Sequence, residues 1–183
     1  NVLGGVMAGN ALANAIGKKG TVYVSNVKPG ISTTDQREEG FKAAMANYPD
    51  IKVLETQFND DDANKASAQV NAVVARAPDL AGIFGANLFS AIGSADGVKA
   101  MGKSGEIKVV AFDAPTRIVD DLKSGLVDLA IAQHPAEIGY MGVMVAFGHV
   151  TGNPVPVAVG TGFTVMTADN IDDPAISKYV YSD

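Results

Sequence analysis

Polar side chains recur along this chain directly after short apolar runs, and four of them carry groups suited to binding a hydroxylated ligand. Arg37 offers a planar guanidinium with several donors, Asp113 offers a carboxylate that accepts hydrogen bonds, and Asn87 and Gln133 can both donate and accept. A carboxylate that accepts from two neighbouring hydroxyl groups is the usual grip on a sugar or polyol, because charge-assisted hydrogen bonds are the strong ones. The residue types therefore favour a site for a small polar molecule.

The elements that must position these residues follow from the apolar runs themselves. The runs at 21–27, 51–57, 80–85, 107–112 and 127–132 predict strands, and helix-like stretches at 36–47, 63–76, 88–101 and 118–124 alternate with them. The first four runs begin roughly 30 residues apart, which is the length of a strand–helix–strand unit. This pattern predicts an α/β fold with a doubly wound parallel sheet and helices on both faces. Ligands of such sheets bind just outside the carboxyl ends of the strands.

Composition excludes several classes of function. The chain has 183 residues, enough for one domain or slightly more, and 47% of them are hydrophobic. Its net charge of −6 and the absence of a Lys/Arg cluster beyond positions 18–19 argue against nucleic-acid binding. There are no cysteines, so thiolate metal sites, disulfides and Cys nucleophiles are excluded. No apolar stretch approaches the ~18 residues that span a bilayer, and no signal peptide is visible.

Arg37 is the most informative single charge. Helix N-cap candidates at 32–35 precede it, and Glu38 stands three residues beyond Asp35, which is a capping-box spacing. This pattern predicts that Arg37 lies in the first turn of a helix, where the macrodipole disfavours a cation by about 0.3–1 kcal/mol. A guanidinium that faces a ligand's oxygens would account for the position. The alternative is an exposed arginine paired with Glu38 and Glu39.

The other three residues have structural alternatives of the same kind. Asp113 directly follows an apolar run, and it could instead cap the helix beyond Pro115. Asn87 and Gln133 occupy equivalent places, and each alone would more often be a turn or capping residue. Together with Arg37 the three are expected to converge on one edge of the sheet, and this joint signal is stronger than any member.

The acidic run at 59–62 resembles the start of a calcium loop, but the rest of the loop is wrong. A loop that begins at Asp60 has Asp62 and Asn64 at the right offsets, whereas Lys65 replaces the required glycine and Asn71 replaces the bidentate glutamate. We therefore expect no metal site, but a solvated helix N-cap of which one residue could touch a ligand. His134 has no Ser or Asp partner in the sequence, and no nucleotide-binding fingerprint is complete, so neither an enzyme nor a cofactor is expected.

Taken together, the motifs resemble a known family. The chain is similar to the second lobe of type I periplasmic sugar-binding proteins, the ribose-binding-like substrate carriers of ABC importers. The similarity covers essentially all 183 residues, and its matching stretches lie at 1–5, 37–41, 85–87, 109–113, 131–139 and 160–165. The resemblance implies that Arg37, Asn87, Asp113 and Gln133 contact the sugar.

The same resemblance implies a function and partners. It implies a periplasmic or extracellular protein, membrane-anchored as a lipoprotein if Gram-positive, that captures a monosaccharide or sugar alcohol and delivers it to the membrane permease of an ABC importer. In ribose-binding relatives an aromatic residue from the loop around Asp61 also touches the sugar, whereas this chain is polar there, which favours another pentose, a deoxysugar or a linear polyol. The alternative is the effector-binding core of a lactose-repressor-type transcription regulator, which shares the fold.

The resemblance also divides the chain. Residues 1–133 and 162–183 would form the C-terminal ligand-binding lobe, and residues 134–161 would belong to an N-terminal lobe that precedes this sequence. The chain opens on a helix at 2–16 rather than on a strand, as expected of a cut inside a longer protein. An apolar helix face formed by Ile138, Met141 and Val145 should then be exposed. It would pack against the missing lobe, another copy or a swapped neighbour.

Overall fold

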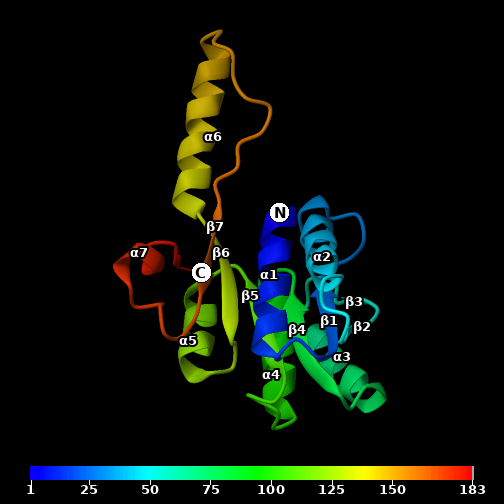
Figure 1. Cartoon of the computed structure of the whole chain (residues 1–183). Helices are drawn as coiled ribbons and strands as arrows, with labels where there is room; N and C mark the ends of the chain where they lie inside the picture. Colours follow the sequence, from blue (N-terminus) through cyan, green and yellow to red (C-terminus); the bar gives the residue numbers. More distant parts are fainter. Residues whose placement is uncertain (183) are drawn as a thin grey trace.

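A mainly parallel sheet forms the centre of the structure, and helices cover both of its faces (Figure 1). The structure is a computed structural model that describes residues 1–182. In this range the strand order is β2-β1-β4-β5-β6-β7, with β3 also paired to β1, and only the β6–β7 pair is antiparallel. The strands are β1 Gly20–Asn26, β2 Ile51–Val53, β3 Gln57–Phe58, β4 Leu80–Gly85, β5 Lys108–Phe112, β6 Leu129–Gln133 and β7 Phe163–Met166.

The helices divide between the two faces because side chains alternate along each strand. Val22 and Val24 of β1 pack with two helices on one face, whereas Tyr23 packs with three helices on the other. The first pair is α1 Val2–Ala15 and α2 Ser32–Met45, and the second set is α3 Ala63–Arg76, α4 Leu88–Ala100 and α5 Thr116–Ser124. This arrangement confirms the predicted doubly wound α/β fold.

Close contact between α1 and α2 fixes the start of the chain against the sheet. A Cβ at Gly5 would lie 2.0 Å from the Arg37 carbonyl oxygen, and a Cβ at Gly40 would lie 2.0 Å from the Val2 carbonyl oxygen. Only glycine therefore allows these two helix backbones to touch. The contact places Asn1 beside Arg37, at the end of the sheet where the parallel strands finish.

The structure corrects two predicted boundaries. The predicted strand at 51–57 is two strands, β2 and β3, because the chain bends away between them and returns to pair with Ser25 and Asn26 of β1. Helix α2 begins at Ser32 after Ile31, which makes no side-chain cap. The predicted capping box is therefore wrong, and the Asp35 carboxylate instead accepts from the Gly30 amide at 2.9 Å. Near its end the chain forms one more short helix, α7 Pro174–Ser177, which Asp173 caps.

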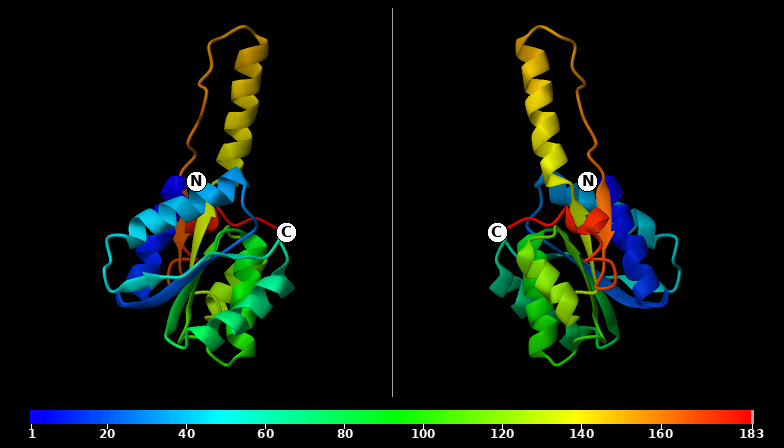
Figure 2. Two further views of the ribbon diagram at one scale, coloured as in Figure 1. Left: turned by 90° about the vertical axis from the view of Figure 1, so that its right-hand side faces the viewer. Right: turned by 90° about the vertical axis from the view of Figure 1, so that its left-hand side faces the viewer.

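Helix α6 Pro135–Val150 extends away from the rest of the molecule, and the following segment returns beside it (Figures 1 and 2). None of its residues is buried. The prediction of an exposed face is right for Ile138 but wrong for Met141 and Val145, which are half-buried because they line a groove with the returning residues 156–161. Other apolar side chains of the helix are more exposed, among them Tyr140 (65% exposed), Val143 (69%) and Phe147 (63%). Among the described residues, every helix is too short or too polar to serve as a transmembrane span.

Candidate functional site

The candidate site lies at the carboxyl ends of the parallel strands. The chain passes from β1 to β2 on one side and then continues with β4 on the other side, so the strand order reverses between β1 and β4. Such a switch point is where open α/β sheets bind ligands. The structure brings the four predicted residues to this edge: Arg37 on α2 after β1, Asn87 after β4, Asp113 after β5, and Gln133 as the last residue of β6.

Arg37 is buried, with 6% of its surface exposed, and its contacts come from the sheet and from α1. Its Nη1 donates to the Ala86 carbonyl oxygen at 2.8 Å, and its Nε donates to Asn1 Oδ1 at 3.1 Å. The guanidinium carbon lies 3.7 Å from the centroid of the Phe112 ring, a cation–π contact. Burial lowers the pKa of Arg37, and the nearby Asp113 carboxylate partly opposes that shift. A buried cation with its fork held in one plane is preorganised to meet ligand oxygens.

The structure contradicts the predicted first-turn position of Arg37 and its alternative pairing with glutamates. Arg37 lies in the second turn of α2 and not in the first, because the helix begins at Ser32. It does not pair with Glu38 or Glu39 either. Glu38 instead accepts from Asn26 Nδ2 at 2.7 Å and from Thr56 Oγ1 at 2.6 Å.

Asp113 and Gln133 form a carboxylate–amide pair. Gln133 Nε2 donates to Asp113 Oδ1 at 2.6 Å, and the Asp113 amide donates to the Ile131 carbonyl oxygen at 3.0 Å. Asp113 has φ 78°, in the left-handed region that non-glycine residues seldom adopt and that clusters at functional sites. The N-cap of α5 is Pro115, so the alternative of Asp113 as the cap of that helix is wrong.

Asn87 combines a structural role with a place in the site. Its Oδ1 caps α4 by accepting from the Ser90 amide at 3.2 Å and the Ser90 hydroxyl at 2.5 Å, as the alternative interpretation predicted. Its Nδ2 donates to Asp61 Oδ1 at 2.6 Å. The cap fixes the side chain, so its amide hydrogens are aimed at the edge of the sheet.

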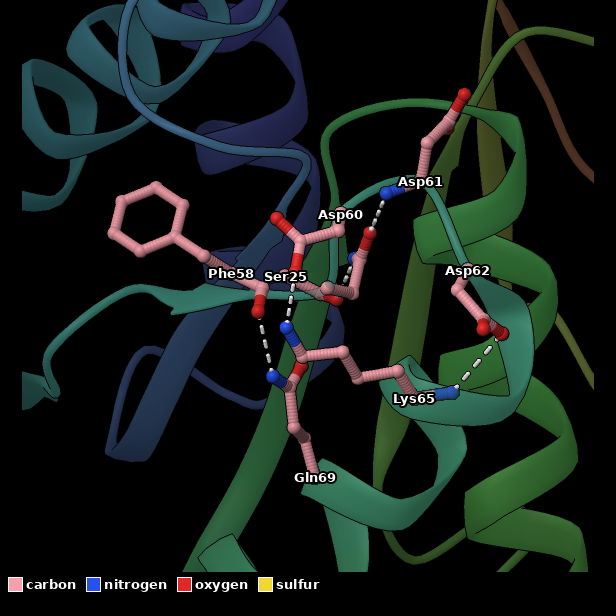
Figure 3. A network of polar contacts seen from close by, with 8 residues as sticks. Ser25, Phe58, Asp60, Asp61, Asp62, Lys65 and Gln69 are labelled. Carbon is pink, nitrogen blue, oxygen red and sulfur yellow. Dashed lines mark hydrogen bonds and ion pairs between the residues drawn. The ribbon is translucent and has the colours of Figure 1, made fainter.

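Asp61 belongs to a loop held by its own polar contacts, drawn in Figure 3. The buried Asn59 donates to Ser25 Oγ at 3.1 Å and to Ser90 Oγ at 2.7 Å, and it accepts from the Asp61 amide at 2.9 Å. Asp62 caps α3 by accepting from the amides of the two residues after Ala63, which confirms the predicted N-cap. This loop therefore holds Asp61 opposite Asn87.

Sequence reasoning did not single out Asp61 from its acidic run. Asp60 and Asp61 both have positive φ, at 56° and 65°. Asp and Asn tolerate that conformation better than other residues, so the composition of 59–62 was the available signal. Within residues 1–182 no group of three or more His, Asp or Glu side chains is arranged to hold a metal ion.

A doubly wound sheet with a buried arginine, two carboxylates and two amides at its carboxyl edge defines a ligand-binding α/β lobe. The chain matches the periplasmic binding protein domain family over residues 1–154, and it belongs to that family. It is 32% identical to the ribose import binding protein RbsB of Haemophilus influenzae over 91% of this chain and 56% of that protein. The chain thus spans about half the length of this relative.

Solved structures agree with this assignment. An ABC transporter solute-binding protein from Agrobacterium vitis, bound with α-D-tagatopyranose, is 66% identical with a TM-score of 0.98. The similarity covers 100% of this chain and 61% of that one. A second solute-binding protein from Agrobacterium vitis, with bound D-fucose, is 26% identical with a TM-score of 0.93, over 99% of this chain and 62% of that one.

Proposed function

We propose that this chain is one lobe, together with a segment of the second, of an extracytoplasmic solute-binding protein, which captures a monosaccharide or sugar alcohol and delivers it to the permease of an ABC importer. The observation that carries the proposal is the convergence of Arg37, Asn87, Asp113 and Gln133 at the switch point of the sheet. Family membership and the sugar-binding roles of the relatives support a carrier over a lactose-repressor-type regulator. The relatives are binding proteins, and the proposed role requires no bond-making chemistry.

Each polar group has a defined part in this proposal. The Asp113 carboxylate accepts from sugar hydroxyls, and its bond from Gln133 sets the direction of its oxygens. Arg37 donates to ring or hydroxyl oxygens from a fixed plane. Asn87 and Asp61 add an amide and a second carboxylate, so the edge offers donors and acceptors in alternation. Hydroxyl groups donate and accept, and such an edge therefore suits a ligand hydroxylated at several carbons.

A ketohexose is the first ligand to test. The 66% identical structure carries α-D-tagatopyranose, whereas the relative with D-fucose is only 26% identical. The polar loop around Asp61 also disfavours a ligand that presents an apolar face there. We therefore propose D-tagatose or a closely related hexose in preference to ribose.

We further propose that residues 134–161 pack in a second lobe, while 1–133 and 162–183 form the lobe described here. The absence of any buried residue on α6 and the exposure of Tyr140, Val143 and Phe147 support this division. In such a protein the ligand binds between two lobes that close about a hinge, and the closed form docks on the permease. An unrelated partner or a swapped copy on α6 would contradict the division.

Isothermal titration calorimetry of the intact protein tests the proposal. The probes are D-tagatose, D-fucose, D-ribose and xylitol, and lactose serves as an oversized control. Asp113→Asn keeps the shape of the side chain but removes its charge, and it should raise the Kd of the best ligand by roughly 10–100-fold, since a charge-assisted hydrogen bond contributes about 1.5–3 kcal/mol. The matched control is Asp50→Asn, an exposed aspartate just before β2 at the opposite edge, which should leave Kd unchanged. No binding to any of the four probes, or wild-type affinity in Asp113→Asn, would contradict the proposal.

A further inference from the structure

The C-terminal segment 174–182 returns to the site edge and contacts it at two places. The Tyr179 ring stacks on the His134 ring, with centroids 3.7 Å apart and planes 8° from parallel. Two residues later the Tyr181 amide donates to the Ala114 carbonyl oxygen at 3.4 Å, and Tyr181 forms a parallel bridge with Pro115. The segment also packs against the hydrophobic core on the sheet face that α3, α4 and α5 cover, through Ile176, Tyr179 and Val180. It is therefore docked on the lobe.

His134 connects β6, where the chain leaves this lobe, with β7, where the chain re-enters it. It directly follows β6, and its Nε2 lies 2.9 Å from Thr164 Oγ1 on β7. Its Nδ1 lies 3.1 Å from Glu137 Oε2 in the first turn of α6. Gly162 has φ 82°, and a Cβ there would lie 3.3 Å from the His134 ring, so glycine allows the returning chain to approach it.

Both contacts of the C-terminal segment adjoin site residues. His134 is next to Gln133 and Ala114 is next to Asp113, and the Gln133–Asp113 hydrogen bond joins the two. Since Asp113 holds a left-handed backbone, its conformation persists only where neighbouring contacts constrain it. The Ala114 and Pro115 contacts supply part of that constraint.

We propose that the C-terminal segment is a brace for the site: Tyr179, acting through His134, and Tyr181, acting through Ala114, position the Gln133–Asp113 pair for its ligand. Tyr179 and Tyr181 are thus positioning residues and do not themselves bind the sugar. The effect on affinity rests on the proposed function, whereas the brace itself is a property of the ligand-free protein.

Three variants of the intact protein test the brace by calorimetry with D-tagatose and by thermal unfolding. Tyr179→Ala removes the stacked ring and should raise Kd roughly three- to tenfold, the range of an aromatic pair. Tyr179→Phe keeps the ring and should restore affinity to within about twofold. Tyr48→Ala is the matched control, because Tyr48 is also half-buried but its hydroxyl bonds Asn10, away from the site. It should lower Tm and leave Kd unchanged. A merely structural Tyr179 would likewise lower Tm without changing Kd, and that result would overturn the proposal.

Amide hydrogen exchange without ligand separates failure of the brace from failure of the function. The Asp113 and Tyr181 amides should exchange several-fold faster in Tyr179→Ala than in the wild type, and Tyr48→Ala should not change them. Unchanged exchange in Tyr179→Ala would overturn the brace, whichever sugars the protein binds. Faster exchange in a protein that binds no sugar would support the brace and contradict the sugar-binding function.

Discussion

Replacing Arg37 by methionine should abolish tight sugar binding while changing the stability of the fold only modestly. The arginine makes two charge-assisted hydrogen bonds, to Ala86 and Asn1, and one cation–π contact with Phe112. At about 1.5–3 kcal/mol for each bond and about 1–2 kcal/mol for the ring contact, these contacts sum to roughly 4–8 kcal/mol. Burial opposes them, because a desolvated cation loses several kcal/mol of hydration, consistent with the lowered pKa of Arg37.

The two contributions nearly cancel in Arg37→Met. We expect its free energy of unfolding to lie within about 2 kcal/mol of the wild type, which corresponds to a Tm shift below about 8 °C for a chain of this size. Arg37→Lys should be the less stable of the two variants, since it retains a buried charge but cannot reproduce the planar fork or its two bonds. Both variants should raise the sugar Kd at least about tenfold, the equivalent of one lost charge-assisted bond.

Urea unfolding and calorimetry on the intact protein measure both quantities. The reasoning would be refuted by wild-type affinity in Arg37→Met, because the guanidinium would then not meet the ligand. It would also be refuted if Arg37→Met were less stable than Arg37→Lys by more than about 2 kcal/mol, because the contacts would then outweigh desolvation. Glu39→Ala, an exposed change on the same helix, is the control and should alter neither value.

Two further predictions concern stability. Gly40→Ala should destabilise the protein by about 2–3 kcal/mol, because the new Cβ would lie 2.0 Å from the Val2 carbonyl oxygen and force α1 away from α2. Urea unfolding measures this loss of stability, and a loss below about 0.5 kcal/mol would contradict the close helix contact. Burial raises the pKa of Glu38, but hydrogen bonds from Lys42, Thr56 and Asn26 outweigh it, and the net pKa lies below the ordinary value of 4.5. The stability that Glu38 contributes is therefore present above about pH 4.5 and lost as the pH falls through its lower folded pKa. Glu38→Gln should accordingly be less stable than the wild type at pH 7, with a difference that shrinks at pH 3; a difference independent of pH would contradict this.

The sequence predicted the strands well where a strand is buried on both faces. Runs such as 80–85 consist almost wholly of apolar residues, because helices cover both sides of the central strands. The prediction failed at 51–57, on the edge of the sheet, where the chain can leave β1 after Val53 and return at Gln57. An edge strand has only one neighbour, so hydrophobic pattern constrains it less.

Helix caps predicted from the local sequence were confirmed at two helices and wrong at a third. Asp62 and Asn87 cap their helices as their types predict, since a cap needs only the next three residues. The Asp35–Glu38 capping box did not form, because α2 already begins at Ser32 and because Asn26 and Thr56, outside the helix, hold the Glu38 carboxylate. A contact between residues far apart in sequence outcompeted the local one.

By itself the sequence determined the α/β class and the position of polar residues after each strand, because these depend on hydrophobic period and on order along the chain. Only the tertiary structure decided that Arg37 is buried against Phe112 rather than paired with its neighbouring glutamates, that Asp61 faces Asn87, and that the C-terminal segment reaches Ala114. These contacts join segments separated by many residues. They depend on the strand order β1-β4-β5-β6 and on the close crossing of α1 and α2, which bring the ends of separate strands to one edge.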